Sequence, residues 1–376
     1  MKNKIIHLLY LFFGLFPIKK NRVVFSSFDY SLYGGNPRVI SDYMLENNKN
    51  YEMVWVLNND VEAKLPSGIK RISSHSLKKI YYYATAKVWV DSHHFYNRWK
   101  RKRQFLIQTW HAAVPLKKLE GNCPDYFSPS HIRQVYHCSQ MADYHLSNSD
   151  MASRILREGV WCQGPILQVG MPVNDMLVNM DKKQRDIILQ KLGLDNDKKY
   201  ILYAPTCRQN ACDDHLNTLD YDGVAQAFQK NWGGQFVILY RGHPIDDASQ
   251  KEKLKNPKVI DVTKVQLVQE LLCIADAVIT DYSSTITDFM LTRRPAFLFA
   301  YDYDNYKGKR DFYIPLESLP FPLAYNNDEL KANIINFDPD QYQKALDDLF
   351  NQWNIRESGT ATQTIVKIID RIITEA

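Results

Sequence analysis

The sequence has no long apolar run and no closely paired cysteines, and its basic and acidic residues nearly balance. None of the apolar runs in its 376 residues approaches the roughly 18–20 residues that span a bilayer as a helix, which excludes a polytopic membrane protein. Internal repeats and low-complexity stretches are missing as well. With 45% hydrophobic and 24% charged residues, the chain has the composition of an ordinary folded protein, which excludes a disordered tail or a collagen-like rod.

The cysteine spacing and the small net charge exclude further classes of protein. None of the six cysteines forms a CxxC pair, which disfavours a zinc site. Scattered cysteines in a chain of this length are typical of reduced thiols in a cytoplasmic protein. The 47 basic and 42 acidic residues leave a net charge of +5, too small an excess to predict a nucleic-acid partner.

Short β-rich runs alternate with longer helical stretches along most of the chain. This alternation predicts parallel α/β domains, and a domain size of about 150 residues predicts two or three of them. In the first half, strands are expected at Arg22–Ser27, Met53–Leu57, Lys87–Asp91, Phe105–Thr109 and Ile166–Val169. In the second half, they are expected at Tyr200–Ala204, Phe236–Tyr240, Val259–Val262, Ala277–Thr280 and Ala296–Ala300.

These strands predict two Rossmann-like, doubly wound domains with helical ends. We expect an N-terminal helix over 1–20, domains over 21–180 and 195–338, and C-terminal helices over 339–376 that pack back across the domains. The charged, helical segment between the domains fits a connection. Two such domains facing a central cleft would bind a ligand beyond the carboxyl ends of their strands.

The N-terminal residues combine an apolar run with basic flanks. Ile5 to Phe16 is strongly apolar but too short to span a bilayer comfortably, and lysines lie on both sides of it. No small-residue cleavage site of the kind that ends a signal peptide follows it. We therefore expect a helix that lies on an anionic membrane surface; a helix that covers a hydrophobic core is the alternative.

A second basic cluster, Arg98–Arg103, surrounds Trp99. We expect this cluster to contact lipid phosphates at the membrane surface. A solvated face of the protein is the alternative.

The segment Ala277–Phe289 places polar groups directly after a buried strand. Asp281, Ser283 and Ser284 are residue types that cap helix N-termini, and a helix is expected to begin among them. Backbone N–H groups and serine hydroxyls at a helix start bind anions, most naturally phosphate. Simple capping without a ligand is the alternative.

Two further strand ends carry cationic or hydroxyl side chains. Arg241 and His243 follow one strand, where both can meet an anionic group at the same sheet edge. Thr206 and Arg208 follow another strand as candidate phosphate contacts. A lone histidine before a proline is more often structural, but the nearby serine-rich helix start favours a functional interpretation.

His111 follows another expected strand, in the segment Phe105–Lys118. A histidine at that edge, facing a cleft, is a candidate general base for a hydroxyl nucleophile. Lys117 and Lys118 are candidates to hold a phosphate. The alternative is a core histidine followed by two solvated lysines.

Two motifs carry weaker signals. Phe25–Arg38 predicts a strand, a glycine loop and a helix start that contains Asn36, but it does not match the dinucleotide-binding fingerprint. Asp302 and Asp304 have a DxD spacing that can hold Mg²⁺ on a diphosphate, although chance matches are common. We therefore expect no metal ligands and no required cofactor, with Mg²⁺ as the alternative.

Taken together, these segments resemble the CDP-glycerol glycerophosphotransferase family, which builds wall teichoic acids and related capsules. The matching segments are, in the family's order, Phe25–Arg38, Gln108–Lys118, Gly170–Asp175, Tyr203–Arg208, Arg241–Pro244 and Thr280–Phe289. Four sites depart from the family's pattern. Ala112–Ala113 replaces Gly-Thr, Cys207 replaces Trp, and Phe321 replaces the Gly of a Pro-Gly-Pro. In Gly170–Asp175, Met171 and Val173 replace the Tyr and Arg of Gly-Tyr-Pro-Arg-Asn-Asp.

The resemblance implies a GT-B-like fold in which 21–180 binds the acceptor and 195–338 binds the CDP donor. It implies transfer of a polyol phosphate from CDP-glycerol or CDP-ribitol to a hydroxyl of a lipid-linked (undecaprenyl-diphosphate) saccharide, with release of CMP. It also implies a peripheral enzyme on the cytoplasmic face of the membrane. His111 and His243 match the family's two catalytic histidines, and Ser283 and Ser284 match its phosphate-binding helix start.

The expected reaction is an in-line displacement at the β-phosphorus, with His111 as base and with Arg241 and His243 stabilising charge on the diphosphate. The lack of a long extra module resembles the family's primases, which add a first glycerol phosphate; a polymerase of teichoic acid or capsule is the alternative. The remaining hypotheses are a GT-B glycosyltransferase that uses a nucleotide sugar and a non-catalytic, membrane-associated partner.

Overall fold

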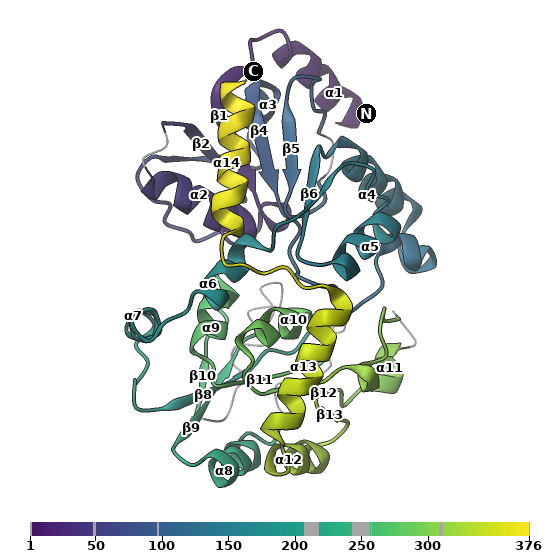
Figure 1. Cartoon of the computed structure of the whole chain (residues 1–376). Coiled ribbons are helices and arrows are strands. Elements are labelled where there is room, and N and C mark those ends of the chain that lie inside the picture. Colours follow the sequence, from purple (N-terminus) through teal and green to yellow (C-terminus); the bar gives the residue numbers. More distant parts are fainter. Residues whose placement is uncertain are drawn as a thin grey trace. The chain divides into compact units, whose positions relative to one another are not determined.

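The computed structural model describes residues 2–47, 50–95, 98–206, 218–242, 256, 258–307 and 311–375. The chain forms two compact units (Figure 1). Unit 1 contains Met1–Ala113, Leu119–Asp175 and Arg356–Ala376, and unit 2 contains Val114–Lys118 and Met176–Ile355. Residues 114–118 therefore belong to unit 2, although they lie inside the range expected for the first domain.

Unit 1 is built on a parallel sheet of seven strands in the order β3-β2-β1-β4-β5-β6-β7. The strands are β1 (Lys19–Ser26), β2 (Glu52–Leu57), β3 (Ile69–Ser73), β4 (Ala86–Asp91), β5 (Phe105–Gln108), β6 (Tyr144–Ser147) and β7 (Ile166–Gln168). The helices are α1 (Lys2–Phe13), α2 (Gly35–Glu46), α3 (Lys78–Thr85), α4 (Pro129–Met141), α5 (Asp150–Gly159) and α14 (Ala361–Thr374).

Both faces of this sheet are covered. Alternate residues of a strand point to opposite faces, so Val23 and Phe25 pack on one side with Ile369 of α14, while Val24 and Trp89 pack on the other with α1 and α3. Burial on both faces explains why the central strands are apolar at successive positions, without the alternation of a half-exposed sheet.

Helix α1 has one covered and one uncovered apolar face. Tyr10 is buried, and Ile6 and Leu9 pack against the same cluster, which includes α3. Leu8 and Phe12 are 62% and 56% exposed. The helix therefore covers part of the core and still presents apolar side chains to its surroundings.

None of the helices that the structure describes combines the length and the apolar character needed to cross a bilayer.

Unit 2 is built on a parallel sheet of six strands in the order β10-β9-β8-β11-β12-β13. The strands are β8 (Lys199–Tyr203), β9 (Phe236–Tyr240), β10 (Val259–Asp261), β11 (Ala277–Thr280), β12 (Ala296–Phe299) and β13 (Leu323–Ala324). The remaining helices are α6 (Asp175–Val178), α7 (Lys182–Leu192), α8 (Tyr221–Trp232), α9 (Val268–Ile274), α10 (Thr285–Phe289), α11 (Tyr303–Lys307), α12 (Asn327–Ile335) and α13 (Pro339–Trp353).

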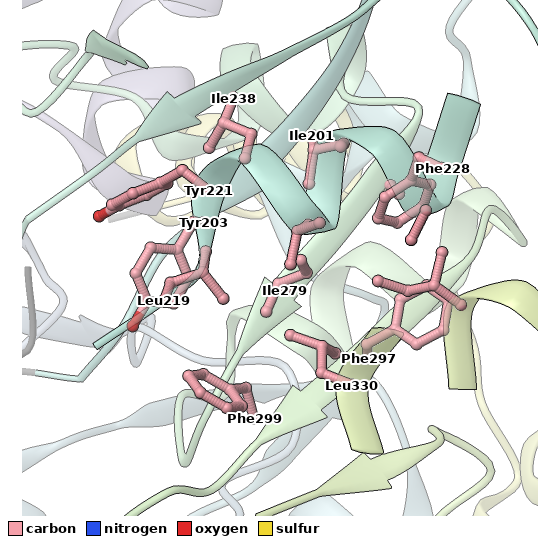
Figure 2. Close-up of a cluster of buried hydrophobic side chains, with 14 of the residues drawn as sticks. Ile201, Tyr203, Leu219, Tyr221, Phe228, Ile238, Ile279, Phe297, Phe299 and Leu330 are labelled. Atoms are coloured by element: carbon pink, nitrogen blue, oxygen red, sulfur yellow. The ribbon is translucent and has the colours of Figure 1, made fainter. Parts of the chain in front are cut away.

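The core of unit 2 lies between one face of this sheet and helices α8 and α12. Figure 2 shows Ile201, Ile279 and Phe297 from three strands meeting Phe228 of α8 and Leu330 of α12. These five side chains are at most 1% exposed. The close packing makes the sheet a rigid support for the loops at its edge.

The strand order reverses at one place in each sheet, between β1 and β4 in unit 1 and between β8 and β11 in unit 2. Loops that leave neighbouring strands at such a switch point turn to opposite faces, which opens a crevice at the carboxyl ends of the strands. The residues of greatest interest follow these strands.

The predicted fold class, two doubly wound parallel α/β sheets, is confirmed. Three strands were not predicted: β3, β6 and β13. β3 pairs with one neighbour only and is partly exposed, and β13 has two residues, so neither carries a strong apolar pattern. The segment predicted as a connection forms α7, which packs against α9 within unit 2.

Candidate functional site

Hydroxyl and carboxylate groups bridge the switch point of unit 1. Ser26 Oγ, at the end of β1, donates a hydrogen bond to Asp91 Oδ2, at the end of β4. Directly after these two strands, the hydroxyls of Ser27 and Ser92 are hydrogen-bonded to each other at 2.9 Å. These bonds fix the two loops at the edge where doubly wound sheets bind ligands.

The backbone of Ser92 also holds the predicted base, His111. Its Nδ1 lies 3.2 Å from the Ser92 carbonyl oxygen. Because a carbonyl oxygen only accepts hydrogen bonds, Nδ1 carries the proton and the lone pair is on Nε2. The His111 side chain is exposed, and its ring lies 5.2 Å from that of His93 and 5.5 Å from that of Phe28. In this tautomer, Nε2 can accept a proton from a hydroxyl group.

Backbone strain is concentrated around His111. Trp110, directly before it, has a φ of 57°, and Phe28, Asp29 and Tyr30 have φ angles of 45°, 49° and 70°. Bulky residues rarely adopt this left-handed region, and such strain persists only where surrounding contacts enforce it. The loops that carry His111 and Phe28 must therefore be held by other residues.

Asn36, predicted to bind substrate, is one of the residues that hold this backbone. Its Nδ2 donates to the carbonyl oxygens of Thr109 at 3.1 Å and Trp110 at 3.0 Å, and its Oδ1 accepts from the Val173 N–H at 3.0 Å. Asn36 is 1% exposed, and both ends of its amide are used. Asn36 therefore positions the residues before His111, and its contact with a substrate stays a prediction.

Arg98 is buried, which corrects its predicted contact with lipid. It is 2% exposed, and its guanidinium lies 2.7 Å from Asp91 Oδ2 and 2.8 Å from the Tyr30 hydroxyl. Pairing within the protein explains why this member of the basic cluster points inward. Lys102 and Arg103, at the end of the cluster, are exposed, and their contact with lipid stays a prediction.

Two histidines beside His111 are kept neutral by burial. Burial lowers the pKa of His93 and lowers that of His94 well below its ordinary value. Within the described ranges, neither ring nitrogen of His94 has a hydrogen-bond partner, nor does Nδ1 of His93. The exposed His111 is therefore the member of this group suited to exchanging a proton with a substrate.

Asp281 bridges the switch point of unit 2 as Asp91 bridges that of unit 1. Its Oδ1 accepts hydrogen bonds from the backbone N–H of Thr206 at 2.9 Å and from the Thr206 hydroxyl at 2.6 Å. Asp281 is 1% exposed. Its carboxylate therefore positions the loop after β8 through Thr206. Direct contact of Asp281 with a substrate stays a prediction.

Ser283 and Ser284 precede the short helix α10. Ser283 Oγ donates to the Thr285 hydroxyl at 2.9 Å and accepts from the Thr285 N–H at 3.3 Å. Ser284 occupies the N-cap position and makes no side-chain capping bond. Both serines are partly exposed, and phosphate binding at this helix start stays a prediction.

Arg241 places a positive charge at the carboxyl edge of the same sheet. It follows β9, and its backbone N–H donates to the Tyr203 carbonyl oxygen at 2.9 Å. The residue is partly exposed, but its Nε atom is buried and has no hydrogen-bond partner in the described part of the chain. Burial lowers the pKa of Arg241 to about 10, so the guanidinium stays charged at neutral pH. Desolvation without a matching anion is unfavourable, which favours an anionic ligand at this position.

Lys117 and Lys118 lie in unit 2 and have partners there. Lys117 Nζ donates to the Tyr306 hydroxyl at 3.1 Å, and Lys118 Nζ pairs with the Asp311 carboxylate. These contacts explain why residues 114–118 belong to unit 2. Phosphate binding by the two lysines stays a prediction.

Two predicted site residues, His243 and Arg208, lie outside the described residues. Of the DxD pair, Asp302 accepts a hydrogen bond from the Tyr282 hydroxyl at 2.8 Å. Across the ranges that the structure describes, no group of three or more His, Cys, Asp or Glu side chains is arranged to hold a metal ion.

The sequence analysis missed the residues that hold His111 in place. Asp91 ends a predicted strand directly before Ser92 and two histidines, and a carboxylate at that point was a usable signal. No local signal marks Arg98, because it stands in a basic run that equally fits a solvated face.

Comparison with known proteins agrees with this arrangement. Residues 8–371 match the family described as CDP-Glycerol:Poly(glycerophosphate) glycerophosphotransferase. The chain is 33% identical to a teichoic acid poly(glycerol phosphate) polymerase of Staphylococcus epidermidis, over 95% of this chain and 52% of that protein. It is 28% identical to a teichoic acid glycerol-phosphate transferase of Staphylococcus aureus, over 98% of each. The chain thus spans about half the length of the first relative and nearly all of the second.

Solved structures give the same result. A histidine-to-alanine variant of the wall teichoic acid polymerase TagF has a TM-score of 0.86 at 30% identity, covering 100% of this chain and 96% of that one. A histidine-to-asparagine TagF variant soaked with CDPG has a TM-score of 0.86 at 32% identity, covering 100% and 94%. A complex of MnaA from S. aureus with UDP has a TM-score of 0.56 at 15% identity over 94% of this chain and 98% of that one, a similarity of fold alone.

Proposed function

Because the chain belongs to the CDP-glycerol:poly(glycerophosphate) glycerophosphotransferase family, we propose that it transfers glycerol phosphate from CDP-glycerol to a hydroxyl of a lipid-linked saccharide and releases CMP. The observation that supports this most directly is Arg241, a charged guanidinium with an unpartnered, buried Nε at a sheet edge. A diphosphate supplies the anion that such a group favours.

The proposed reaction is a displacement at the β-phosphorus of the donor. The acceptor oxygen forms a bond to this phosphorus, the bond from phosphorus to the bridging oxygen breaks, and CMP leaves with that oxygen. His111 Nε2 takes the proton of the attacking hydroxyl, while its Nδ1–H stays bonded to the Ser92 carbonyl oxygen. Little covalent chemistry is required of the protein, so positioning and charge stabilisation supply most of the rate.

In this proposal, unit 2 binds the donor. Arg241 binds the diphosphate, and Ser283 and Ser284 offer hydroxyl groups at the same edge of the sheet, beside the loop that Asp281 holds at Thr206. His243 and Arg208 are proposed to act with them. Unit 1 holds the acceptor beside His111.

We also propose that α1 attaches the enzyme to the cytoplasmic face of an anionic membrane. Leu8, Phe12 and Leu15 are 62%, 56% and 82% exposed, and Lys19 and Lys20 follow on the exposed start of β1. An apolar face next to lysines suits insertion at the boundary of acyl chains and anionic head groups. A lipid-linked acceptor would then lie in the same membrane.

Repeated addition is the second candidate function. A teichoic acid poly(glycerol phosphate) polymerase of Bacillus spizizenii is 26% identical over 97% of this chain and 95% of that protein. This match along nearly the whole of a polymerase favours a ladder of products.

The test is CMP release by the purified protein from CDP-glycerol or CDP-ribitol, with and without a short-chain disaccharide diphosphate lipid, followed by product mass. Acceptor-dependent CMP with one added glycerol phosphate supports a primase, and a ladder supports a polymerase. A folded protein that releases no CMP from either donor contradicts the proposal.

A His111→Ala variant measures the contribution of the base. Turnover should fall on the order of 10²–10⁴-fold, because that is what a positioned proton acceptor contributes. His137→Ala, which changes another exposed histidine of unit 1 on α4, is the matched control and should leave turnover unchanged. Near-normal turnover of folded His111→Ala would remove this histidine from the role.

A further inference from the structure

The buried ion pair between Asp91 and Arg98 lies directly behind the loop that holds His111. We propose that this pair is a positioning device for His111, acting through the carbonyl group of Ser92. The consequence for catalysis rests on the proposed function, whereas the consequence for the state of the His111 ring does not. Neither residue is proposed to touch a substrate.

Arg98 joins three segments of unit 1 at one point. Its Nη1 donates to Asp91 Oδ2 at 2.7 Å, its Nε donates to the Tyr30 hydroxyl at 2.8 Å, and its Nη2 lies 3.4 Å from Ser26 Oγ. The guanidinium carbon also lies 4.8 Å from the centre of the Tyr30 ring. One planar, five-donor group can make these contacts together, which an ammonium group cannot.

Asp91 passes this constraint to the backbone of the next residues. Its Oδ2 binds Arg98 and Ser26, while its Oδ1 accepts from the His93 N–H at 3.1 Å. The Asp91 carbonyl oxygen accepts from the Thr109 N–H at 2.7 Å. The Asp91 side chain thus holds the peptide between Ser92 and His93 through the His93 N–H. The Asp91 backbone holds Thr109, two residues before His111.

The Ser92 carbonyl then fixes the His111 ring. It accepts the Nδ1–H at 3.2 Å, which selects the tautomer with the lone pair on Nε2. Tyr30 belongs to the left-handed turn that also contains Phe28, whose ring lies 5.5 Å from that of His111. Arg98 therefore supports both neighbours of the imidazole, the carbonyl through Asp91 and the aromatic ring through Tyr30.

A purely architectural role would not require this chemistry. Two buried charges lose their hydration, and a well-packed apolar pair of the same volume is often as stable. Asp91 and Arg98 are both 2% exposed. An apolar pair would bind neither the His93 N–H nor the Tyr30 hydroxyl, so it would fill the volume without fixing the turn that presents the Ser92 carbonyl.

Unit 1 contains a natural control for the experiment. Arg22 is 1% exposed, binds Glu52 through two bonds of 3.0 Å, and lies over the rings of Tyr81 and Tyr82. This ion pair lies on β1 and β2, four residues before Ser26 along β1. It is also an arginine–carboxylate pair, although Glu52 is partly exposed. Among the described residues, it makes no hydrogen bond or ion pair with the loops around His111.

The experiment compares two double variants, Asp91→Asn with Arg98→Met and Glu52→Gln with Arg22→Met. Removing both charges of a pair avoids leaving one buried charge without a partner, so both proteins are expected to fold. Each is assayed for turnover, for KM of CDP-glycerol, and for the His111 tautomer by ¹⁵N NMR, with His111→Ala used to assign the signal.

In the Asp91/Arg98 variant, we expect kcat to fall roughly 10- to 100-fold, a part of what a positioned base contributes, with the KM of CDP-glycerol unchanged. We also expect the His111 ring to become a mixture of tautomers. The Glu52/Arg22 variant should keep wild-type values for all three. A folded Asp91/Arg98 variant with wild-type kcat and a pure Nδ1–H tautomer overturns the proposal.

Two further outcomes are also decisive. If the wild-type protein releases no CMP, the proposed function fails, and the tautomer comparison still tests the positioning role. If the double variant does not fold, Arg98→Lys takes its place, because lysine keeps the charge opposite Asp91 but loses the fork that also reaches Tyr30. Unchanged kcat and tautomer in folded Arg98→Lys would then overturn the proposal.

Discussion

Arg98 and Arg241 are both arginines near the carboxyl edge of a parallel sheet, but within the described part of the chain only Arg98 pairs with a carboxylate. Arg98 has a carboxylate at 2.7 Å and a tyrosine hydroxyl at 2.8 Å. Arg241 has a buried Nε with no partner among the described residues, and burial lowers its pKa to about 10. A cation matched within the fold supports architecture, whereas one left unmatched marks where a ligand completes the structure.

The two switch points show the same contrast. In each, an aspartate at the carboxyl end of one strand accepts a hydrogen bond from a hydroxyl that follows or ends the neighbouring strand: Ser26 donates to Asp91 in unit 1, and Thr206 donates to Asp281 in unit 2. The bridging carboxylates thus belong to the scaffold in both units. The groups suited to chemistry stand beside them, namely His111 in one unit and Arg241 in the other.

The largest expected effect is on folding. Replacing Arg98 by Met leaves the Asp91 carboxylate buried and uncompensated, so the free energy of unfolding should fall by about 3–5 kcal/mol. Arg241→Met is the control and should leave unfolding unchanged or slightly more favourable to the folded state, because its Nε has no partner to lose. Urea denaturation of both variants measures the difference. Equal losses in the free energy of unfolding would contradict the different roles assigned to the two arginines.

Acid should destabilise unit 1 before unit 2. Burial lowers the pKa of His145 to about 4. Between pH 6.5 and 4, this histidine is protonated in the unfolded chain but neutral in the folded protein. The free energy of unfolding therefore falls as the pH falls, by up to roughly 3 kcal/mol. His93 and His94 act in the same direction. The described part of unit 2 contains no histidine.

Hydrogen exchange measured peptide by peptide between pH 7 and pH 4.5 checks this expectation. Peptides from β4, β5 and β6 should lose protection before those from β8 and β11. His145→Gln is the control, since it removes one of the titrating groups and should reduce the pH dependence. Simultaneous loss of protection in both units would show that they unfold as one.

Arg241→Met should weaken donor binding. We expect the Kd of CDP-glycerol to rise on the order of 10- to 100-fold, because a charge-assisted contact to phosphate is worth about 1.5–3 kcal/mol. Arg241→Lys should recover part of the loss, since it keeps the charge without the planar fork. Titration calorimetry on the folded variants gives both values, and unchanged affinity would mean that Arg241 faces no diphosphate.

The smallest effect concerns α1. Leu8 is 62% exposed, so Leu8→Gln should change the free energy of unfolding by less than about 0.5 kcal/mol and weaken binding to anionic vesicles roughly 3- to 10-fold. Leu9→Gln, one residue further and packed against the core cluster, should instead reduce stability. Sedimentation with vesicles and thermal melting separate the two faces; equal vesicle binding by wild type and Leu8→Gln would contradict a membrane role for this face.

The parallel fold and the positions of the candidate groups at strand ends were predictable from local pattern. Apolar runs such as Val23–Phe25 suit strands buried on both faces, and polar residues directly after such runs must lie at a sheet edge. Strand β6 was not predicted, because Tyr144–Ser147 includes a histidine and a serine and so lacks an apolar pattern. Both polar residues are buried by contacts with distant parts of the chain.

The sequence by itself determined the fold class, the family and the strand ends at which His111, Arg241 and the serines stand, because these depend on periodicity and on the order of short motifs. Only the tertiary structure decided that Arg98 is matched by Asp91, that Asn36 and Asp281 position backbone, and that 114–118 joins unit 2. Burial and pairing depend on residues distant in the chain: Arg98 meets Tyr30 across 68 positions, and no local window contains both.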